Sequence, residues 1–371
     1  MESDLKQKQS SKPHKHLWAN ICPRKLYWEL EQTTDKSLFK EWYFYPEILA
    51  ESFRLLNQAG VTGIRLNIFN YELTFKQKST DWQALELALN LAQQNQLQVH
   101  LCLGPWQYPL WPGLRLPNYM TASMTASKVE SQPNTINYLD NNLEIFEWGN
   151  WWLESQLERY GNDPRIAGFY LGNEWPNEQA LENDVETNWK ISPAYMSQAM
   201  AICHAYTDKP IIMNTNLDAS QPEKIINTYQ KLWQFAPKQF RLALDVYPSR
   251  ETWRLAPELR FRRQHLSWAE DVKRLQSKIP VQVMVGEFEA QPWGAGESWA
   301  QWWQNSSGNF DHRLKFSPKI LNQWFIRYLN PAPINEITLW GAEFWLTGQL
   351  LGYGWPLKLV RQWSQLFGQE K

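Results

Sequence analysis

The sequence alternates between short apolar segments and segments whose apolar residues recur at helical spacing, and this pattern constrains the fold most. The segment "PEILAESFRLLNQAG" (46–60) places its apolar residues on one helical face and ends on glycine, a helix-stop signal. The apolar run that follows, "VTGIRLNIF" (61–69), reads as a strand. Eight such strands alternate with helices, which predicts a parallel sheet closed into a (β/α)8 TIM barrel of the α/β class.

No linker interrupts this series, so we expect one catalytic domain over residues 16–371, preceded by a disordered polar tail at 1–15. The longest elaborated loop is an aromatic and proline-rich stretch at about 104–142. An open doubly wound sheet is the competing architecture. The sequence lacks the G-x-G-x-x-G and G-x-x-x-x-G-K-[ST] motifs that would favour it. The predicted strands cover residues 16–22, 61–69, 97–106, 165–174, 210–216, 239–248, 281–289 and 336–346.

Composition and charge disfavour several classes of partner. The 37 basic and 38 acidic residues nearly cancel, so we expect neither a nucleic-acid partner nor an anionic membrane surface. The three cysteines are widely separated, and the six histidines are scattered, so no zinc site, other metal site or cofactor is predicted. The sequence shows neither a secretory signal nor a membrane span, which predicts a cytoplasmic location. It carries no signal for an oligomeric state.

Polar residues stand at the carboxyl ends of the predicted strands, where barrels of this kind hold their chemistry. In the second strand, Ile64, Leu66 and Ile68 share the outward phase, so Arg65 and Asn67 are predicted to face inward. The same alternation groups Asp245 with Tyr247, Glu174 with Gly168, Tyr170 and Gly172, Glu287 with Val283 and Val285, and Glu343 with Trp345 and Gly341.

Glu174 and Glu287 end the fourth and seventh predicted strands, which lie opposite one another around an eight-stranded ring. Hydrolysis of a glycosidic bond needs two carboxyl groups, one to protonate the leaving oxygen and one to attack or stabilise the anomeric carbon. This pair predicts a glycosidase.

The chain is rich in tryptophan, with 23 in all. A ring that follows a strand end can stack on the apolar face of a sugar, which indicates a carbohydrate substrate. The tryptophans in such positions are Trp106, Trp111, Trp175, Trp293 and Trp345.

These residues resemble the clan of retaining (β/α)8 glycoside hydrolases that includes families five, thirty-nine and forty-two. The hallmarks of that clan are an Asn-Glu pair closing strand four, here Asn173-Glu174, and a second Glu closing strand seven, here Glu287. The stretches "EFEAQPWG" and "LWGAEFW" are similar to those of cellulase-like members of the clan. The chain departs from the pattern at Gln291, where Glu is usual, and at Trp175, where Pro is usual.

The resemblance implies a role for each matching residue. Glu174 would be the acid/base and Glu287 the nucleophile of a retaining mechanism, with the carboxyl groups about 5 to 5.5 Å apart. Apolar neighbours such as Trp175 would raise the pKa of Glu174, while Arg65 and Tyr247 would keep Glu287 ionised. The resemblance implies that Arg65, Asn173, Tyr247 and Trp345 contact the substrate or the nucleophile. The predicted substrate-binding residues also include Glu343, Trp106, Trp175 and Trp293, which stand at or after the ends of predicted strands.

Two other function classes remain open at this point. One is a catalytically silent carbohydrate-binding protein on a glycosidase-like barrel, which the intact carboxyl pair disfavours. The other is a metal-dependent barrel hydrolase, which would need an H-x-H at a strand end, and the sequence has none there. The sugar, its linkage, and endo or exo action are not predicted.

Overall fold

The structure is a computed structural model of the 371-residue chain. It describes residues 15–23, 25–27, 30, 46–67, 74–75, 79–80, 82–106, 113–114, 116, 137–177, 179–181, 184–217, 219–246, 257–289, 318–350, 352 and 354–368. The predicted tail at 1–15 lies outside these residues except for Lys15.

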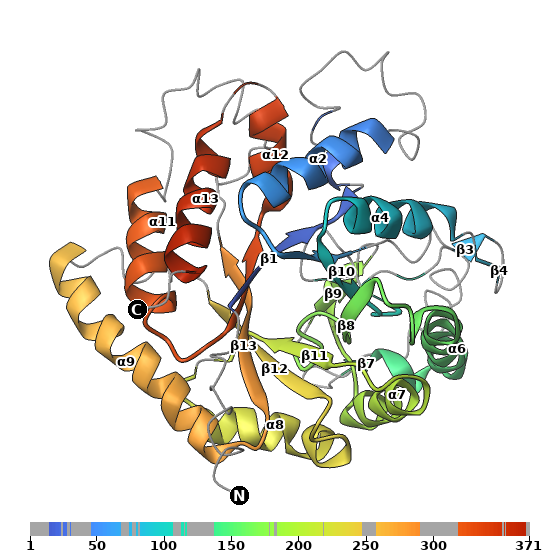
Figure 1. Cartoon of the computed structure of the whole chain (residues 1–371). Coiled ribbons are helices and arrows are strands. Elements are labelled where there is room, and N and C mark those ends of the chain that lie inside the picture. The colour runs from blue at the N-terminus through green and yellow to red at the C-terminus, as the bar shows by residue number, and fades with distance from the viewer. Residues whose placement is uncertain are drawn as a thin grey trace, which may run out of the picture.

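Eight parallel strands form a closed barrel at the centre of the molecule (Figure 1), which confirms the predicted TIM barrel. Each strand pairs in parallel with its two neighbours, as alternating strand and helix units require. In order around the ring the strands are β1 (His16–Ile21), β14 (Glu336–Trp340), β13 (Gln282–Glu289), β12 (Phe240–Val246), β11 (Ile211–Thr215), β8 (Ile166–Tyr170), β5 (Gln98–Cys102) and β2 (Gly63–Leu66).

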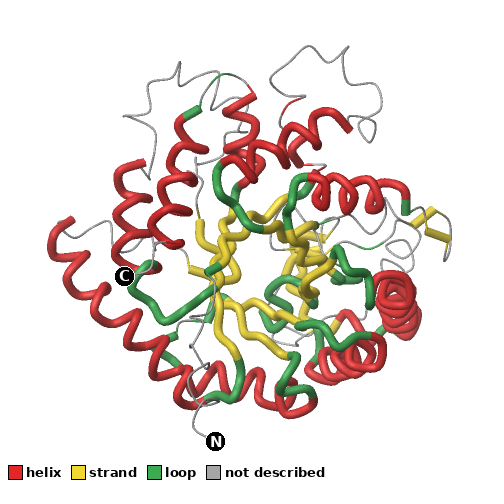
Figure 2. Tube along the Cα trace, viewed as in Figure 1, coloured by secondary structure: helices red, strands yellow, loops and turns green. Residues whose placement is uncertain are grey.

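Helices surround this ring, as Figure 2 shows with red helices outside yellow strands. The predicted helix at 46–60 is confirmed as α2, and Gly60, at φ +81°, supplies the left-handed residue after its end. The surrounding helices are α2 (Pro46–Gln58), α4 (Gln83–Gln94), α6 (Leu143–Tyr160), α7 (Pro193–Tyr206), α8 (Pro222–Phe235), α9 (Pro257–Lys278), α11 (Pro318–Trp324) with the π-helical turn η5 (Phe325–Leu329), and α13 (Trp355–Gly368). None of the helices in the described part of the chain is long and apolar enough to span a membrane.

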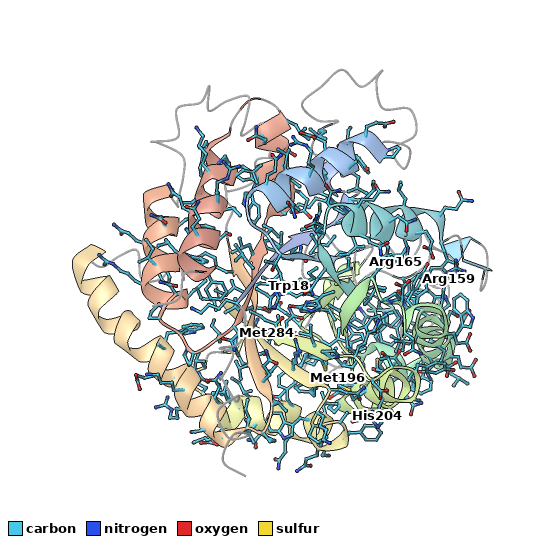
Figure 3. All side chains as sticks on the ribbon, in the orientation of Figure 1. Trp18, Arg159, Arg165, Met196, His204 and Met284 are labelled. Atoms are coloured by element: carbon cyan, nitrogen blue, oxygen red, sulfur yellow. The ribbon has the colours of Figure 1, made fainter. Side chains whose placement is uncertain are left out.

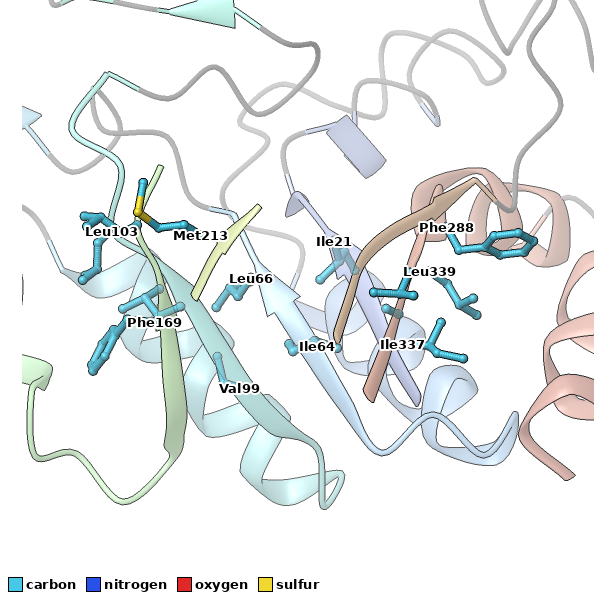
Figure 4. Packing of buried hydrophobic residues seen from close by; sticks show 14 of the residues in the cluster. Ile21, Ile64, Leu66, Val99, Leu103, Phe169, Met213, Phe288, Ile337 and Leu339 are labelled. Carbon is cyan, nitrogen blue, oxygen red and sulfur yellow. The ribbon is translucent and has the colours of Figure 1, made fainter. Parts of the chain in front are cut away.

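The barrel strands separate two packed layers. Outward-facing side chains such as Ile64, Leu66 and Phe169 belong to the large core between strands and helices (Figure 4). A second cluster of buried residues lies inside the ring. Figure 3 labels Trp18 and Met284 near the middle of the barrel. The residues of this inner cluster are Cys102, Tyr170, Ile212, Ala243 and Met284.

A bulge in β13 changes which side chains face the barrel interior. Leu244 pairs with Val285 but Asp245 pairs with Glu287, so Gly286 is an extra residue in β13. The predicted shared phase of Glu287 with Val283 and Val285 is therefore wrong. Both valines pack in the outer core, whereas Glu287 reaches the interior.

The eighth predicted strand is too long. β14 ends at Trp340, Gly341 adopts φ +98°, and helix α12 (Ala342–Leu350) follows. A left-handed residue ends the extended ladder, so Glu343 and Trp345 lie on a helix and not on a strand. The predicted strand phase for these two residues is wrong.

The loops that follow β2, β5 and β8 carry further short strands. The hairpin strands β3 (Thr74–Phe75) and β4 (Ser79–Thr80) pair after β2. A small sheet with the order β6 (Gly113–Leu114), β9 (Gln179–Leu181), β10 (Asp184–Lys190) and β7 (Asn137–Tyr138) joins the loops after β5 and β8, and the turn η3 (Leu139–Asn141) follows β7. The described part of the elaborated stretch at 104–142 thus contributes two strands to this sheet.

Candidate active site

The site lies at the carboxyl ends of the barrel strands, and its first element is the tight loop after β8. The strand ends at Tyr170, four residues before Glu174, and Gly172 and Glu174 both take left-handed conformations, at φ +74° and +48°. A Cβ on Gly172 would lie 2.1 Å from the Trp175 ring, so only glycine fits there. This turn, rather than continued strand alternation, aims Glu174 at the barrel mouth.

Arg65 of β2 bonds to both segments that carry the predicted catalytic glutamates. Its Nη1 donates to Glu287 Oε1 over 2.8 Å, and its Nη2 donates to Asn173 Oδ1 over 2.7 Å. The guanidinium stacks over the Tyr170 ring at 4.1 Å, and Arg65 is fully buried. The predicted inward orientation of Arg65 is confirmed, and its charge is committed to Glu287.

Asn214, at the end of β11, is a site residue that the sequence reasoning missed. Its Nδ2 lies 2.8 Å from Asn173 Oδ1, 2.9 Å from Asp245 Oδ2 and 3.4 Å from Glu287 Oε1. Its Oδ1 accepts the backbone N–H of Glu174 over 3.1 Å. The sequence does contain a signal for this residue. Asn214 is two positions from the inward-facing Ile212, so strand alternation places its side chain inside the barrel, as it does for Arg65.

Asp245 of β12 adds a third carboxyl group. It was predicted to face inward, and that orientation is confirmed by its contacts with Asn214 and by its pairing with Glu287. It also lies close enough to Glu174 for each carboxyl group to affect the pKa of the other. Among the described residues, three carboxyl groups therefore converge on a site that holds one buried guanidinium.

The surroundings raise the pKa of two of these carboxyl groups. Burial first, and then the charge of Glu287, raise the pKa of Glu174 to about 7, although contact with Asp245 and the charge of Arg65 act in the opposite direction. Burial also raises the pKa of Asp245 well above its usual range, with the charges of Glu287 and Glu174 adding to the effect. Glu287 forms the ion pair with Arg65.

Two tryptophans predicted to line an open cleft are buried instead. Trp106 and Trp175 are 0% and 1% exposed, and they pack on one another and on Tyr195, with ring centroids 4.5 to 6.1 Å apart. Gly149 and Gly172 let the two rings close against the backbone, so in this structure their faces contact other side chains, and sugar stacking by them stays a prediction.

The two residues of α12 are also buried. Glu343 accepts the backbone N–H of Cys22 over 2.6 Å and lies 3.8 Å from Lys25 Nζ. Its carboxylate therefore binds the residues that follow β1. Trp345 is 1% exposed. The predicted site residues Tyr247 and Trp293, together with Trp111 and Gln291, lie outside the described residues. In the described ranges, His, Cys, Asp and Glu side chains form no group arranged to hold a metal ion.

The glycoside hydrolase family 42 model, described as β-galactosidase, matches residues 39–191, which include Arg65, Asn173 and Glu174. No curated protein matches the chain. The predicted resemblance to (β/α)8 glycoside hydrolases is confirmed.

Solved structures share the barrel. The β-galactosidase of the psychrophilic Marinomonas ef1 is 11% identical with a TM-score of 0.53, over 87% of this chain and 53% of that chain. The endo-β-1,4-mannanase of Thermotoga petrophila is 10% identical with a TM-score of 0.55, over 97% and 78%. The exo-β-1,4-mannosidase Op5Man5 of Opitutaceae bacterium strain TAV5 is 14% identical with a TM-score of 0.56, over 95% and 60%. The chain spans about half the length of the β-galactosidases that it matches.

Proposed function

We propose that the protein is a glycoside hydrolase that cleaves a β-linked glycoside or oligosaccharide with retention of configuration. The observation that carries the proposal is the contrast between two buried carboxyl groups at the barrel mouth. Glu287 is ion-paired with Arg65 over 2.8 Å, whereas the pKa of Glu174 is raised to about 7. One group suits a nucleophile and the other a proton donor at neutral pH.

The chemistry follows from these assignments. Glu174 protonates the leaving oxygen while the Glu287 carboxylate attacks the anomeric carbon, which forms a covalent glycosyl-enzyme. Glu174, now ionised, takes a proton from water, and that water releases the sugar with its original configuration. Asn173 Oδ1 accepts from Arg65 and Asn214, so its Nδ2 is the group that donates to the sugar 2-hydroxyl.

The substrate class rests on the relatives. The β-galactosidases, the β-1,4-mannanase and the β-1,4-mannosidase are named for β-linked substrates. Together with the match to a glycoside hydrolase family, these names support a β-linked substrate for this chain.

A panel of aryl β-glycosides and β-linked oligosaccharides tests the proposal. Wild-type protein should release sugar, with the first-formed product retaining the β-configuration in NMR spectra. Glu287→Ala should lose this activity. Glu336→Ala is the matched control, because Glu336 is a buried strand glutamate paired with Arg241 over 2.6 Å, and it lies at the amino-terminal end of β14.

Three results would contradict the proposal. Activity that persists undiminished in Glu287→Ala would remove the nucleophile. A first product of inverted configuration would require the carboxyl groups to lie further apart than the predicted separation of about 5 to 5.5 Å. Sugar binding without turnover by the wild type would instead favour a silent carbohydrate-binding protein.

A further inference from the structure

Asp245 is a carboxyl group that the two-carboxylate mechanism does not use. It stands at the end of β12, opposite Glu287 in the ladder and in contact with Glu174. Its position in the barrel interior is expensive for a charged group, because an ion there loses its hydration.

The contacts of Asp245 divide between its two oxygens. Oδ2 accepts from Asn214 Nδ2 over 2.9 Å. Oδ1 is buried, and no N–H or hydroxyl of the described residues donates to it. Gly286 leaves room for this atom, since a Cβ there would come within 2.7 Å of Oδ1.

A carboxyl–carboxyl contact makes a hydrogen bond only when one partner holds a proton. This condition applies to Asp245 and Glu174, which lie close together, since Asp245 Oδ1 is buried with no donor among the described residues. Two ionised groups there would repel one another in a buried site. A protonated Asp245 instead has a donor to give, while Oδ2 continues to accept from Asn214.

The surrounding charges favour the proton on Asp245. Within the described part of the chain, Arg65 is the cation that acts on Asp245, but its terminal nitrogens bond to Glu287 and Asn173. Burial and both neighbouring glutamates oppose ionisation of Asp245. The titratable groups of the described residues that face Asp245 are Glu174 after β8, Glu287 of β13, Arg65 of β2, Tyr170 of β8 and Tyr229 of α8.

We propose that Asp245 is a positioning residue that remains protonated and donates a hydrogen bond to Glu174. This bond strengthens when Glu174 becomes a carboxylate, the form that accepts a proton from water in the second half of the reaction. The proton on Asp245 stays there throughout, so Glu174 alone gives and regains the catalytic proton. The catalytic consequence rests on the proposed function, but the protonation of Asp245 does not.

Infrared difference spectroscopy tests the protonation on the full-length protein without substrate. At least one pH unit above the pKa of Glu174, wild type should keep a C=O band of a protonated carboxyl group that Asp245→Asn lacks. The control Asp271→Asn, which changes an aspartate paired with Arg274 on α9, should keep the band. A spectrum of wild type that matches Asp245→Asn would overturn the proposal, whether or not any glycoside is cleaved.

The pH profile tests the hydrogen bond to Glu174. Asp245→Asn keeps a neutral donor, so the alkaline limb of kcat/KM should stay in place. Asp245→Ala lacks the donor, so that limb should move to higher pH, and release of sugar from the covalent intermediate should slow by about tenfold to a hundredfold. The Asn variant should recover at least about tenfold of this loss.

Other outcomes of the same profiles would overturn the proposal. If Asp245 were ionised, Asp245→Asn would remove a negative charge and move the alkaline limb to lower pH. If Asp245 only filled space, Asp245→Ala would leave the alkaline limb of kcat/KM at the same pH. Should the Ala variant fail to fold, the limb of the Asn variant and the infrared band still decide.

Discussion

Arg65 and Glu287 form an ion pair that is buried on both sides, with 2.8 Å between Nη1 and Oε1 and exposed fractions of 0% and 3% for the two side chains. The two residues are 222 positions apart in the sequence, and β2 and β13 are separated by two strands of the ring. A charge pair in such a site depends on both partners, because either ion alone would be buried without compensation.

Replacing Arg65 with methionine should therefore destabilise the protein by about 3 to 5 kcal/mol and abolish activity. Methionine keeps the length of the side chain but removes the charge that holds Glu287. Denaturant unfolding measures the first effect and sugar release the second. Arg54→Met is the control, since Arg54 pairs with Glu51 on the exposed face of α2 and should change the free energy of unfolding little. Equal effects of the two substitutions would contradict this account.

The raised pKa of Glu174 predicts a pH-dependent stability. Between its ordinary pKa of about 4.5 and its folded value of about 7, the unfolded chain releases the proton while the native protein keeps it. The free energy of unfolding should therefore fall as the pH rises through this window, by about 3 kcal/mol in total from this group. Glu174→Gln cannot titrate, so it should lack this decrease and be more stable than wild type at pH 8.

Thermal or denaturant unfolding at pH 5 and pH 8 measures the difference. Glu51→Gln, which alters an exposed glutamate on α2, should keep the wild-type dependence. If Glu174 is the general acid, kcat/KM of the wild type should also decline above about pH 7. A pH dependence of stability that is identical in wild type and Glu174→Gln would show that Glu174 ionises normally.

Asn214 should tolerate aspartate less well than alanine. Alanine removes an amide that donates to Asn173 and Asp245, which should cost about 1 to 3 kcal/mol of stability. Aspartate also removes the donor, and it adds a fourth carboxyl group beside Asp245 and Glu287. Unfolding and kcat/KM of both variants provide the measurement, with Asn57→Asp as a surface control because Asn57 donates to Asn95 O at an exposed site. An Asn214→Asp variant with wild-type kcat/KM would remove Asn214 from the site.

Gly172→Ala should disturb the loop that carries Glu174. The substitution places a Cβ on a left-handed residue and 2.1 Å from the Trp175 ring, so the ring must move. Gly352→Ala is the matched control, because Gly352 is also left-handed, at φ +93°, but a Cβ there meets nothing within 4 Å. Gly352→Ala should lose about 1 to 2 kcal/mol from the backbone alone. Gly172→Ala should lose more and reduce kcat, and equal losses would show that Trp175 yields without cost.

The fold was predictable because the alternation of helix and strand is a local property repeated along the chain. Arg65 and Asp245 are single polar residues among apolar neighbours in their strands. Strand alternation therefore predicted that both side chains face inward. The register of β13 could not be predicted from the sequence, because the bulge depends on pairing with β12 and β14. Gly286 is the local sequence feature that accompanies it. Likewise, Gly341 gave the one signal that β14 ends before Glu343.

The roles of aromatic residues were harder to predict for a physical reason. An indole ring gains free energy both from packing in a core and from stacking on a sugar, so its type and position do not separate the two. Trp175 closes on Gly172 because that glycine has no side chain, a relationship formed by the turn itself. Asn214 was not predicted because a single amide at a strand end is common. Its importance in the site comes from hydrogen bonds with four partners on other elements.

The left-handed backbone of Glu174 has a consequence for selection. Glutamate at φ +48° is disfavoured relative to glycine or asparagine, and this residue is also buried beside two other carboxyl groups. A search for thermostable variants that ignores turnover should therefore enrich Gly or Asn at position 174. Enrichment of that kind would mark the position as one where the fold gives up stability for chemistry.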